Sequence, residues 1–178
     1  MKIICFGDSN TFGYDARALM DDRYPPECRW VDILKKRSGW NVINQGLNGR
    51  EIPPCSVHVA ADTDLLIIML GTNDLLQGND SSTVAKKMER FLCSLQFPAE
   101  KILLVSPVPM KLGAWVPDSS VVKYSEELSR HYQSIAGKFG TRFVDAGQWA
   151  VALTYDGIHY TEDGQIAFAE GLYTYLMK

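Results

Sequence analysis

The chain has 178 residues, 46% of which are hydrophobic, and a formal net charge of -3. A chain of this length and apolar content fits a single globular domain over residues 1–178, whose core needs no cofactor and no disulfide to form. The slightly acidic charge and the lack of any Lys/Arg run argue against nucleic acid as a partner.

Short apolar runs alternate along the chain with segments of helical periodicity, which is typical of a parallel sheet with crossover helices. The third and fourth runs, LLIIML and KILLVS, are apolar on both faces, so we expect them at the centre of the sheet. The predicted strands, in chain order, are residues 2–6, 41–45, 64–70, 101–106 and 141–145.

Apolar residues recur every three or four positions in four further segments, which predicts helices that each bury one face on the sheet. These segments are residues 30–37, 84–95, 121–139 and 166–176. Thr161, followed by two acidic residues, is typical of the N-cap of the last helix. Five parallel strands with right-handed crossovers predict a three-layer α/β/α sandwich with the flavodoxin-like strand order 2-1-3-4-5.

Glycines and small polar residues follow each of the first three predicted strands. They form the stretches GDSN at 7–10, NQGLNG at 44–49 and GTND at 71–74. In an open parallel sheet, ligands bind outside the carboxyl ends of the strands, near the point where the strand order reverses. We therefore expect these three stretches to border a single crevice.

The residues near this crevice can supply a serine nucleophile and its base. Ser9 follows the first strand, and a serine hydroxyl needs a base within hydrogen-bond reach that is itself oriented by a third group. In the stretch YDGIH, Asp156 can approach Nδ1 of His159 if Gly157 allows a tight turn. The fifth strand lies about 14 Å from the first at the usual spacing, but the connection over residues 146–158 is long enough to return across the sheet.

Acyl transfer also requires hydrogen-bond donors aimed at the developing oxyanion. The crevice offers the backbone N–H groups of Ser9 and Gly46 and the side-chain amide of Asn73. Glycine lets the substrate approach the backbone closely. The asparagine amide donates without a charge that would bind the ground state of the substrate equally well.

The blocks GDSN, Gly46, GTND and DGIH resemble, in order and position over nearly the whole chain, those of the SGNH hydrolases, also called GDSL esterases and lipases. The resemblance implies that Ser9 is the nucleophile and His159 the base, with Asp156 as the partner of the base. It also implies an oxyanion hole made by Ser9, Gly46 and Asn73.

One position departs from the motif, because Asn10 stands where the name-giving motif of the family has leucine. The segments RYPPECRW at 23–30 and QGLNGR at 45–50 further resemble the compact bacterial arylesterase and acyltransferase branch. This second resemblance favours small acyl esters over long-chain lipids.

The sequence therefore predicts a serine esterase that hydrolyses small carboxylic esters, with short acyl chains or O-acetyl groups, and uses neither a cofactor nor a metal. A lysophospholipase or an acyl-thioesterase of the same mechanism is an alternative. A non-catalytic flavodoxin-like binding module is an alternative from a different class, although the chain has no G-x-G-x-x-G or P-loop motif. The α/β-hydrolase fold shares the chain order Ser, Asp, His, but its G-x-S-x-G motif is absent.

Long connections in a compact domain usually carry function, and Trp115 in one of them could wall an acyl pocket. Arg29 and Arg50 border the predicted crevice, where an anionic substrate is one possible partner and a surface ion pair is the default interpretation.

A homo-oligomer is a further possibility, because apolar loop residues could bury against a second subunit. These residues are Leu19, Met20, Leu112, Trp115 and Val116.

The longest strongly apolar run, residues 65–70, is far shorter than the roughly 20 residues of a membrane span, and the chain reaches Asp8 too early for a signal peptide. We therefore expect a cytoplasmic protein without membrane association. No two of the four cysteines form a C-x-x-C pair, and because no secretion signal is predicted, we expect the thiols to be reduced. The histidines at 58, 131 and 159 are too far apart for a local pair of metal ligands.

Overall fold

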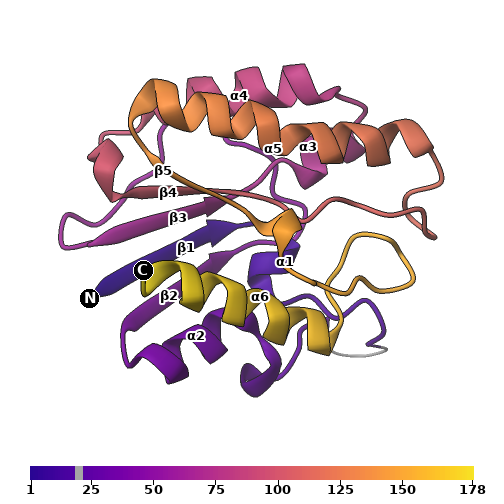
Figure 1. Ribbon diagram of the computed structural model, residues 1–178, viewed down its shortest axis with the longest axis horizontal. Helices are drawn as coiled ribbons and strands as arrows, with labels where there is room; N and C mark the ends of the chain where they lie inside the picture. Colours follow the sequence, from indigo (N-terminus) through magenta and orange to yellow (C-terminus); the bar gives the residue numbers. More distant parts are fainter. Residues whose placement is uncertain (19–21) are drawn as a thin grey trace.

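The structure is a computed structural model that describes residues 1–18 and 22–178 (Figure 1). Its described residues form a five-stranded parallel sheet with the order β2-β1-β3-β4-β5, which confirms the predicted topology. Every strand boundary lies within one residue of its predicted position. The strands are β1 (Lys2–Gly7), β2 (Asn41–Gly46), β3 (Leu65–Met69), β4 (Ile102–Ser106) and β5 (Arg142–Asp145).

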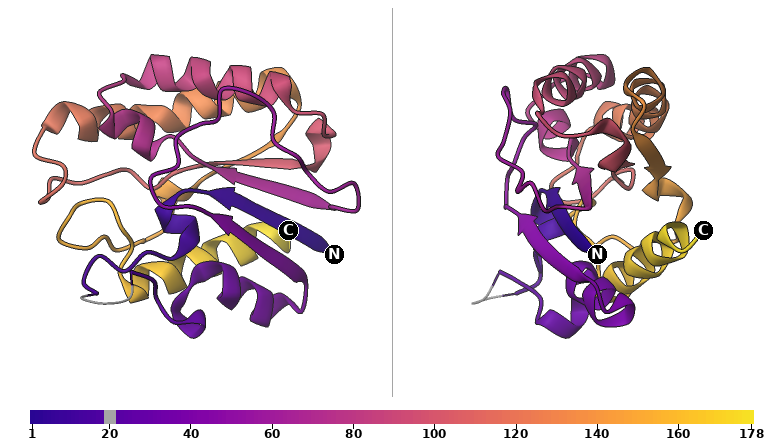
Figure 2. Two further views of the ribbon diagram at one scale, coloured as in Figure 1. Left: turned by 180° about the vertical axis from the view of Figure 1, so that it is seen from behind. Right: turned by 90° about the vertical axis from the view of Figure 1, so that its left-hand side faces the viewer.

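Helices cover both faces of the sheet and complete the predicted three-layer sandwich (Figures 1 and 2). One face carries α2 (Trp30–Ser38) and α6 (Glu162–Leu176). The other face carries α3 (Thr72–Leu76), α4 (Ser81–Ser94) and α5 (Ser119–Phe139). Short 3-10 helices in the connections are η1 (Pro26–Cys28), η2 (Ala99–Lys101) and η3 (Ala146–Gln148).

The strands fill two separate cores, because alternate side chains point to opposite faces of the sheet. In β1, Ile3 and Cys5 pack with residues of α2 and α6, whereas Ile4 and Phe6 pack with residues of α4 and α5. Every residue of β3 and β4 is buried, as their apolar sequences predict. In β1, every residue after Lys2 is buried, so this strand is also interior.

Two short helices at the carboxyl ends of β1 and β3 are not among the predicted elements. In α1 (Ser9–Phe12), the carboxylate of the N-cap Asp8 accepts a hydrogen bond from the N–H of Asn10 at 3.0 Å. Helix α3 follows Gly71, whose φ is +121°. Helices of four or five residues have no measurable apolar periodicity, so the sequence indicates only turns at these places.

The longer helices begin and end at residues with ordinary capping chemistry. The predicted N-cap Thr161 accepts a hydrogen bond from the N–H of Gly164 at 3.0 Å, which fixes the start of α6. Asp80 caps α4 through the N–H of Thr83 at 2.7 Å. Helix α2 ends at Gly39, which adopts a left-handed conformation with φ +70°.

The apolar residues suggested to meet a second subunit do not share one environment. Leu112 and Trp115 are 64% and 51% exposed. Val116 is only 1% exposed and packs in the core beside α4 and α5, so it is not available to a partner. Leu19 and Met20 lie outside the described residues.

Candidate active site

Ser9 stands at the carboxyl end of β1, beside the point where the strand order reverses (Figure 1). A Cβ atom on Gly7 would lie 2.1 Å from Oγ1 of Thr11, so the strand can end here only with glycine. Asp8 caps α1, and Ser9 is the first residue of that helix. Residues 8–11 are all buried, so the serine stands on a well-packed junction between strand and helix.

The structure brings Ser9, Asp156 and His159 together. Oγ of Ser9 lies 2.9 Å from Nε2 of His159, 150 positions later in the chain. Nδ1 of His159 lies 2.6 Å from Oδ2 of Asp156. Because the Nδ1–H group is donated to the carboxylate, Nε2 remains as the acceptor for the serine hydroxyl. All three side chains are less than 10% exposed, at 6% for Ser9, 0% for Asp156 and 4% for His159.

The carboxylate of Asp156 is stabilised by groups of its own loop. Oδ1 accepts hydrogen bonds from Oγ1 of Thr154 at 2.7 Å and from the N–H of Ile158 at 2.8 Å. Burial by itself raises the pKa of Asp156, but the hydrogen bonds from His159 and the loop outweigh burial and leave the pKa below its usual range. Gly157 turns the chain between acid and base at φ +84°, a conformation that favours glycine.

The loop that carries His159 is bound to residues 107–118, the connection that follows β4. The N–H of Trp115 donates to the carbonyl of Asp156 at 3.1 Å, and the N–H of Lys111 donates to the carbonyl of Gly157 at 3.0 Å. A Cβ atom on Gly157 would lie 2.1 Å from the carbonyl oxygen of Lys111, so this contact also requires glycine. These bonds help to fix the base near β1 although its loop follows β5.

A cavity of about 180 Å³ lies beside the serine and the imidazole. The rings of Tyr14 and Trp115 both contact His159, with centroid distances of 4.4 Å and 5.4 Å. Trp115 thus forms a wall of the cavity, as its place in a long connection suggested. Tyr14 was not predicted, because nothing in the sequence distinguishes a single aromatic residue in a loop from one outside the site. The cavity is lined by Ser9, Tyr14, Asn48, Gly49, Asn73, Leu76, Trp115, Ile158 and His159.

The three expected oxyanion donors differ in what they already bind. Ser9 and Asn73 line the cavity. The Asn73 amide donates one N–H to the carbonyl of Arg50 at 3.0 Å, which leaves its second N–H for a ligand. Gly46 is not among the described residues that line the cavity, and its N–H donates to Oδ1 of Asn44 at 2.8 Å. The Gly46 N–H can therefore serve an oxyanion only by sharing its hydrogen or after Asn44 turns away.

The sequence matches a known family over most of its length. Residues 5–167 match the family described as GDSL-like lipase/acylhydrolase. The chain belongs to this family. It is an enzyme that hydrolyses ester bonds.

Solved structures match this GDSL-like hydrolase over nearly its whole length. A carbohydrate acetylesterase family member from Sinorhizobium meliloti is 30% identical, with a TM-score of 0.82 over 99% of this chain and 97% of that chain. The aryl esterase of M. smegmatis is 25% identical, with a TM-score of 0.84 over 99% of this chain and 98% of that chain. Among curated proteins, none matches the sequence.

Arg29 and Arg50, which were predicted to border the crevice, are not among the described residues that line the cavity of this GDSL-like hydrolase, and both have partners within the protein. Arg50 donates from Nη1 to the carbonyls of Gly7, at 2.9 Å, and Gln45. It therefore joins the carboxyl ends of β1 and β2 instead of forming the ion pair that is the default interpretation. Arg29 does form such a pair, with Asp32 at 2.7 Å.

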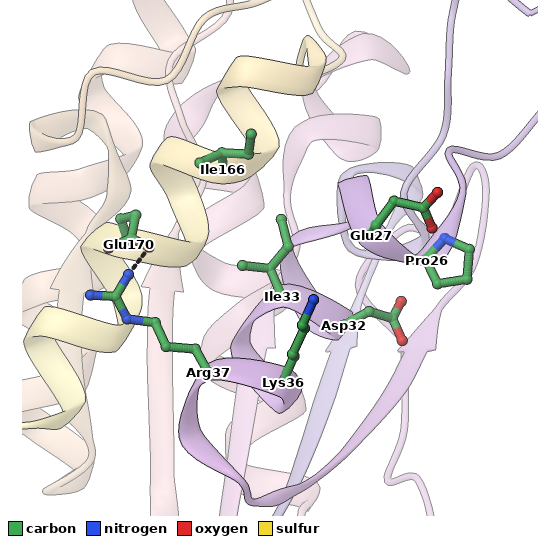
Figure 3. Close-up of a pocket in the computed structure, with 8 residues that line it drawn as sticks. All are labelled: Pro26, Glu27, Asp32, Ile33, Lys36, Arg37, Ile166 and Glu170. Carbon is green, nitrogen blue, oxygen red and sulfur yellow. Dashed lines mark hydrogen bonds and ion pairs between the residues drawn. The ribbon is translucent and has the colours of Figure 1, made fainter.

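A larger groove of about 770 Å³ lies between α2 and α6 (Figure 3), and neither Ser9 nor His159 is among the described residues that line it. Arg37 and Glu170 form an ion pair there, and none of the described lining residues is a serine, cysteine or histidine. The groove therefore offers no serine, cysteine or histidine for ester chemistry. In the part of the chain that the structure describes, no cluster of His, Cys, Asp or Glu could hold a metal ion. The residues that line the groove are Pro26, Glu27, Asp32, Ile33, Lys36, Arg37, Ile166 and Glu170.

Proposed function

We propose that the chain is a serine esterase for small carboxylic esters, with Ser9 as nucleophile, His159 as base and Asp156 as the partner of the base. The row of hydrogen bonds from Ser9 through His159 to Asp156, beside a cavity of about 180 Å³, carries this proposal. It meets the two requirements of serine catalysis, a base within reach of the hydroxyl and a third group that orients the base.

In the proposed reaction, Oγ of Ser9 attacks the ester carbonyl carbon while its proton passes to Nε2 of His159. The tetrahedral intermediate collapses with cleavage of the ester C–O bond, and the alcohol leaves with the proton from His159. A water molecule then attacks the acyl-serine while His159 takes its proton, and the carboxylic acid is released as Ser9 regains a proton. Asp156 remains ionised and stabilises the imidazolium at each step.

The proposed oxyanion hole consists of the Ser9 backbone N–H, the Asn73 amide and, once Asn44 releases it, the Gly46 N–H. Loss of one donor of this kind costs about a hundred- to a thousand-fold in kcat. We therefore expect Asn73→Ala to lower kcat by that factor without a change in the circular dichroism spectrum. Unchanged kcat in Asn73→Ala would remove this residue from the hole.

The size of the cavity supports a short acyl group. A cavity of about 180 Å³ is small for a fatty acyl chain. Trp115 is half exposed, so an alcohol or phenol portion can extend past it into solvent. The names of the solved relatives, a carbohydrate acetylesterase and an aryl esterase, fit this substrate class. A lysophospholipase or a thioesterase for long acyl chains would need a longer cavity.

The test combines an active-site variant with a series of acyl chain lengths. Ser9→Ala should abolish hydrolysis of p-nitrophenyl acetate, and a fluorophosphonate probe should label the wild-type protein but not the variant. Among p-nitrophenyl esters, kcat/KM should fall from acetate through butyrate to octanoate. Wild-type turnover in Ser9→Ala would refute the triad, and a preference for octanoate would refute the short-acyl assignment. Failure of the probe to label the wild-type protein would refute Ser9 as the nucleophile.

Among the described residues, no helix combines the length and the apolar character that a membrane span needs. The cytoplasmic location and the homo-oligomeric state stay predictions from the sequence.

A further inference from the structure

Asn10, the residue directly after the proposed nucleophile, connects the nucleophile's helix to both sides of the proposed base. Its side chain is 4% exposed. Nδ2 donates to the carbonyl of Ile158 at 3.2 Å, and Oδ1 accepts from the N–H of Tyr160 at 3.1 Å. Because Ile158 and Tyr160 flank His159 in the chain, one amide holds the backbone immediately before and after the base.

We propose that Asn10 is a positioning residue that sets the distance between Oγ of Ser9 and Nε2 of His159. This inference rests on the proposed function. It deepens that function by assigning a role to the position where the chain departs from the leucine of the GDSL motif.

The need for such a contact follows from how the base loop is built. Oδ1 of Asp156 accepts hydrogen bonds from the N–H groups of Ile158 and His159, at 2.8 Å and 3.0 Å, while Oδ2 contacts Nδ1 of His159. Acid and base therefore form a unit that keeps its own geometry wherever the loop lies. The position of this unit relative to Ser9 has to be fixed by other contacts, and the Asn10 amide supplies two of them from within α1.

Asn10 is itself held from the opposite side. Nε1 of Trp30 donates to the backbone carbonyl of Asn10 at 2.9 Å, and the N–H of Trp30 donates to Oε1 of Gln165 at 3.0 Å. Trp30 and Gln165 are 1% and 0% exposed. A continuous row of buried hydrogen bonds thus connects α6, α2, α1 and the base loop.

Leucine has the same branching and the same number of side-chain heavy atoms as asparagine, but it is bulkier and has no hydrogen-bonding group, so Asn10→Leu would remove both contacts with the base loop. The loop has further support, because the hydroxyl of Tyr24 donates to the carbonyl of Tyr160 at 3.3 Å. The contacts of Gly157 and Asp156 with residues 107–118 also remain. We therefore expect Asn10→Leu to fold, with the base loop displaced relative to Ser9.

The experiment measures kcat, KM and the pH profile of kcat/KM for p-nitrophenyl acetate, per active site titrated with a fluorophosphonate. A displacement of about 1 Å at a catalytic group can cost on the order of a hundred-fold in rate. We expect Asn10→Leu to lower kcat about ten- to a hundred-fold with KM nearly unchanged. The midpoint of the pH profile should stay where it is, because the contact between Asp156 and His159 is retained.

The matched control is Ser38→Ala, at the end of α2. Oγ of Ser38 also joins two backbone groups, since it accepts from the N–H of Trp40 at 3.1 Å and donates to the carbonyl of Leu34 at 2.7 Å. Ser38→Ala should lower the melting temperature but leave kcat per active site unchanged. A drop in kcat shared by both variants would assign Asn10 a general structural role and overturn the proposal.

A crystal structure of Asn10→Leu gives a second readout. A separation of Ser9 Oγ and His159 Nε2 clearly above 2.9 Å supports the proposal, whereas an unchanged distance with wild-type kcat overturns it. Where Asn10→Leu fails to fold, Asn10→Ser serves the same test, because its short side chain cannot reach both backbone groups. If the wild-type protein fails to react with the probe, the proposed function is wrong. If the wild-type protein and the variant both react, and at equal rates, the proposed function stands and the role of Asn10 is wrong.

Discussion

Ser9 and His159 lie 2.9 Å apart, yet the segments that carry them are held in different ways. Ser9 is fixed by a strand end, a close-packed glycine and a capped helix within a few residues of itself. His159 stands in a loop without helix or strand and is fixed by hydrogen bonds to segments far away in sequence. Local sequence thus determines where the proposed nucleophile lies, whereas the place of the proposed base depends on the whole fold.

The largest expected effect tests the base side of this comparison. Asp156→Asn replaces the acceptor of the Nδ1–H group with a group that can donate, so His159 is left in the wrong tautomer. We expect a loss of about 10⁴-fold in kcat for p-nitrophenyl acetate. Asp145→Asn is the control, because Asp145 also accepts a backbone N–H two residues on, from Gly147 at 2.9 Å, but lies at the end of β5. Equal activities of the two variants would contradict the role of Asp156.

A second, smaller effect concerns the turn that brings acid and base together. Gly157→Ala places a side chain at φ +84° and 2.1 Å from the carbonyl oxygen of Lys111. The left-handed conformation costs about 1–2 kcal/mol and the overpacking about 1–3 kcal/mol more, so we expect the free energy of unfolding to fall by about 2–5 kcal/mol and kcat to fall with it.

Gly39→Ala separates these two contributions. Gly39 has a similar φ of +70°, but a Cβ atom there would have no heavy atom within 4 Å. This variant should lose about 1–2 kcal/mol of unfolding free energy in urea titrations and no activity. If Gly157→Ala were no more destabilised than Gly39→Ala, the contact with Lys111 would not constrain the base loop.

The smallest effect tests the nucleophile side. Burial raises the pKa of Asp8 from its usual 3.8 to about 6, against the lowering effects of the Asn10 N–H and of His159. The folded protein therefore binds a proton here more tightly than the unfolded chain does. The contribution of Asp8 to stability is complete below pH 3.8 and is lost as the pH rises through about 6.

Asp8→Asn should remove this pH dependence and stabilise the protein at pH 7.5 by up to about 3 kcal/mol, as measured by urea unfolding at pH 4.5 and 7.5. Asp80→Asn provides the opposite sign. The N–H of Thr83 lowers the pKa of Asp80, so this carboxylate stabilises the fold above its unfolded pKa and its loss should destabilise at pH 7.5. The same sign in both variants would mean that burial of Asp8 does not control its titration.

The sheet could be predicted from the sequence because each strand is a short apolar run of its own. Ser9, Asp156 and His159 could be named as candidates because a serine after the first strand and a D-x-x-H before the last helix are local patterns, and the structure brings the three side chains together. Helices α1 and α3 could not be predicted, since four or five residues carry no periodicity. The hydrogen bonds of Asn10 with Ile158 and Tyr160, and the bond from Gly46 to Asn44, depend on side-chain directions that only the folded chain defines.

At position 115 the contact that holds the base loop is made by the backbone N–H, while the indole ring lines the cavity and is half exposed. Support of the loop and lining of the cavity are therefore carried by different atoms of one residue. Every substitution at this position except proline exchanges the ring without removing the N–H that donates to the carbonyl of Asp156. Position 115 is thus a suitable starting point for engineering the enantioselectivity or leaving-group preference of this enzyme.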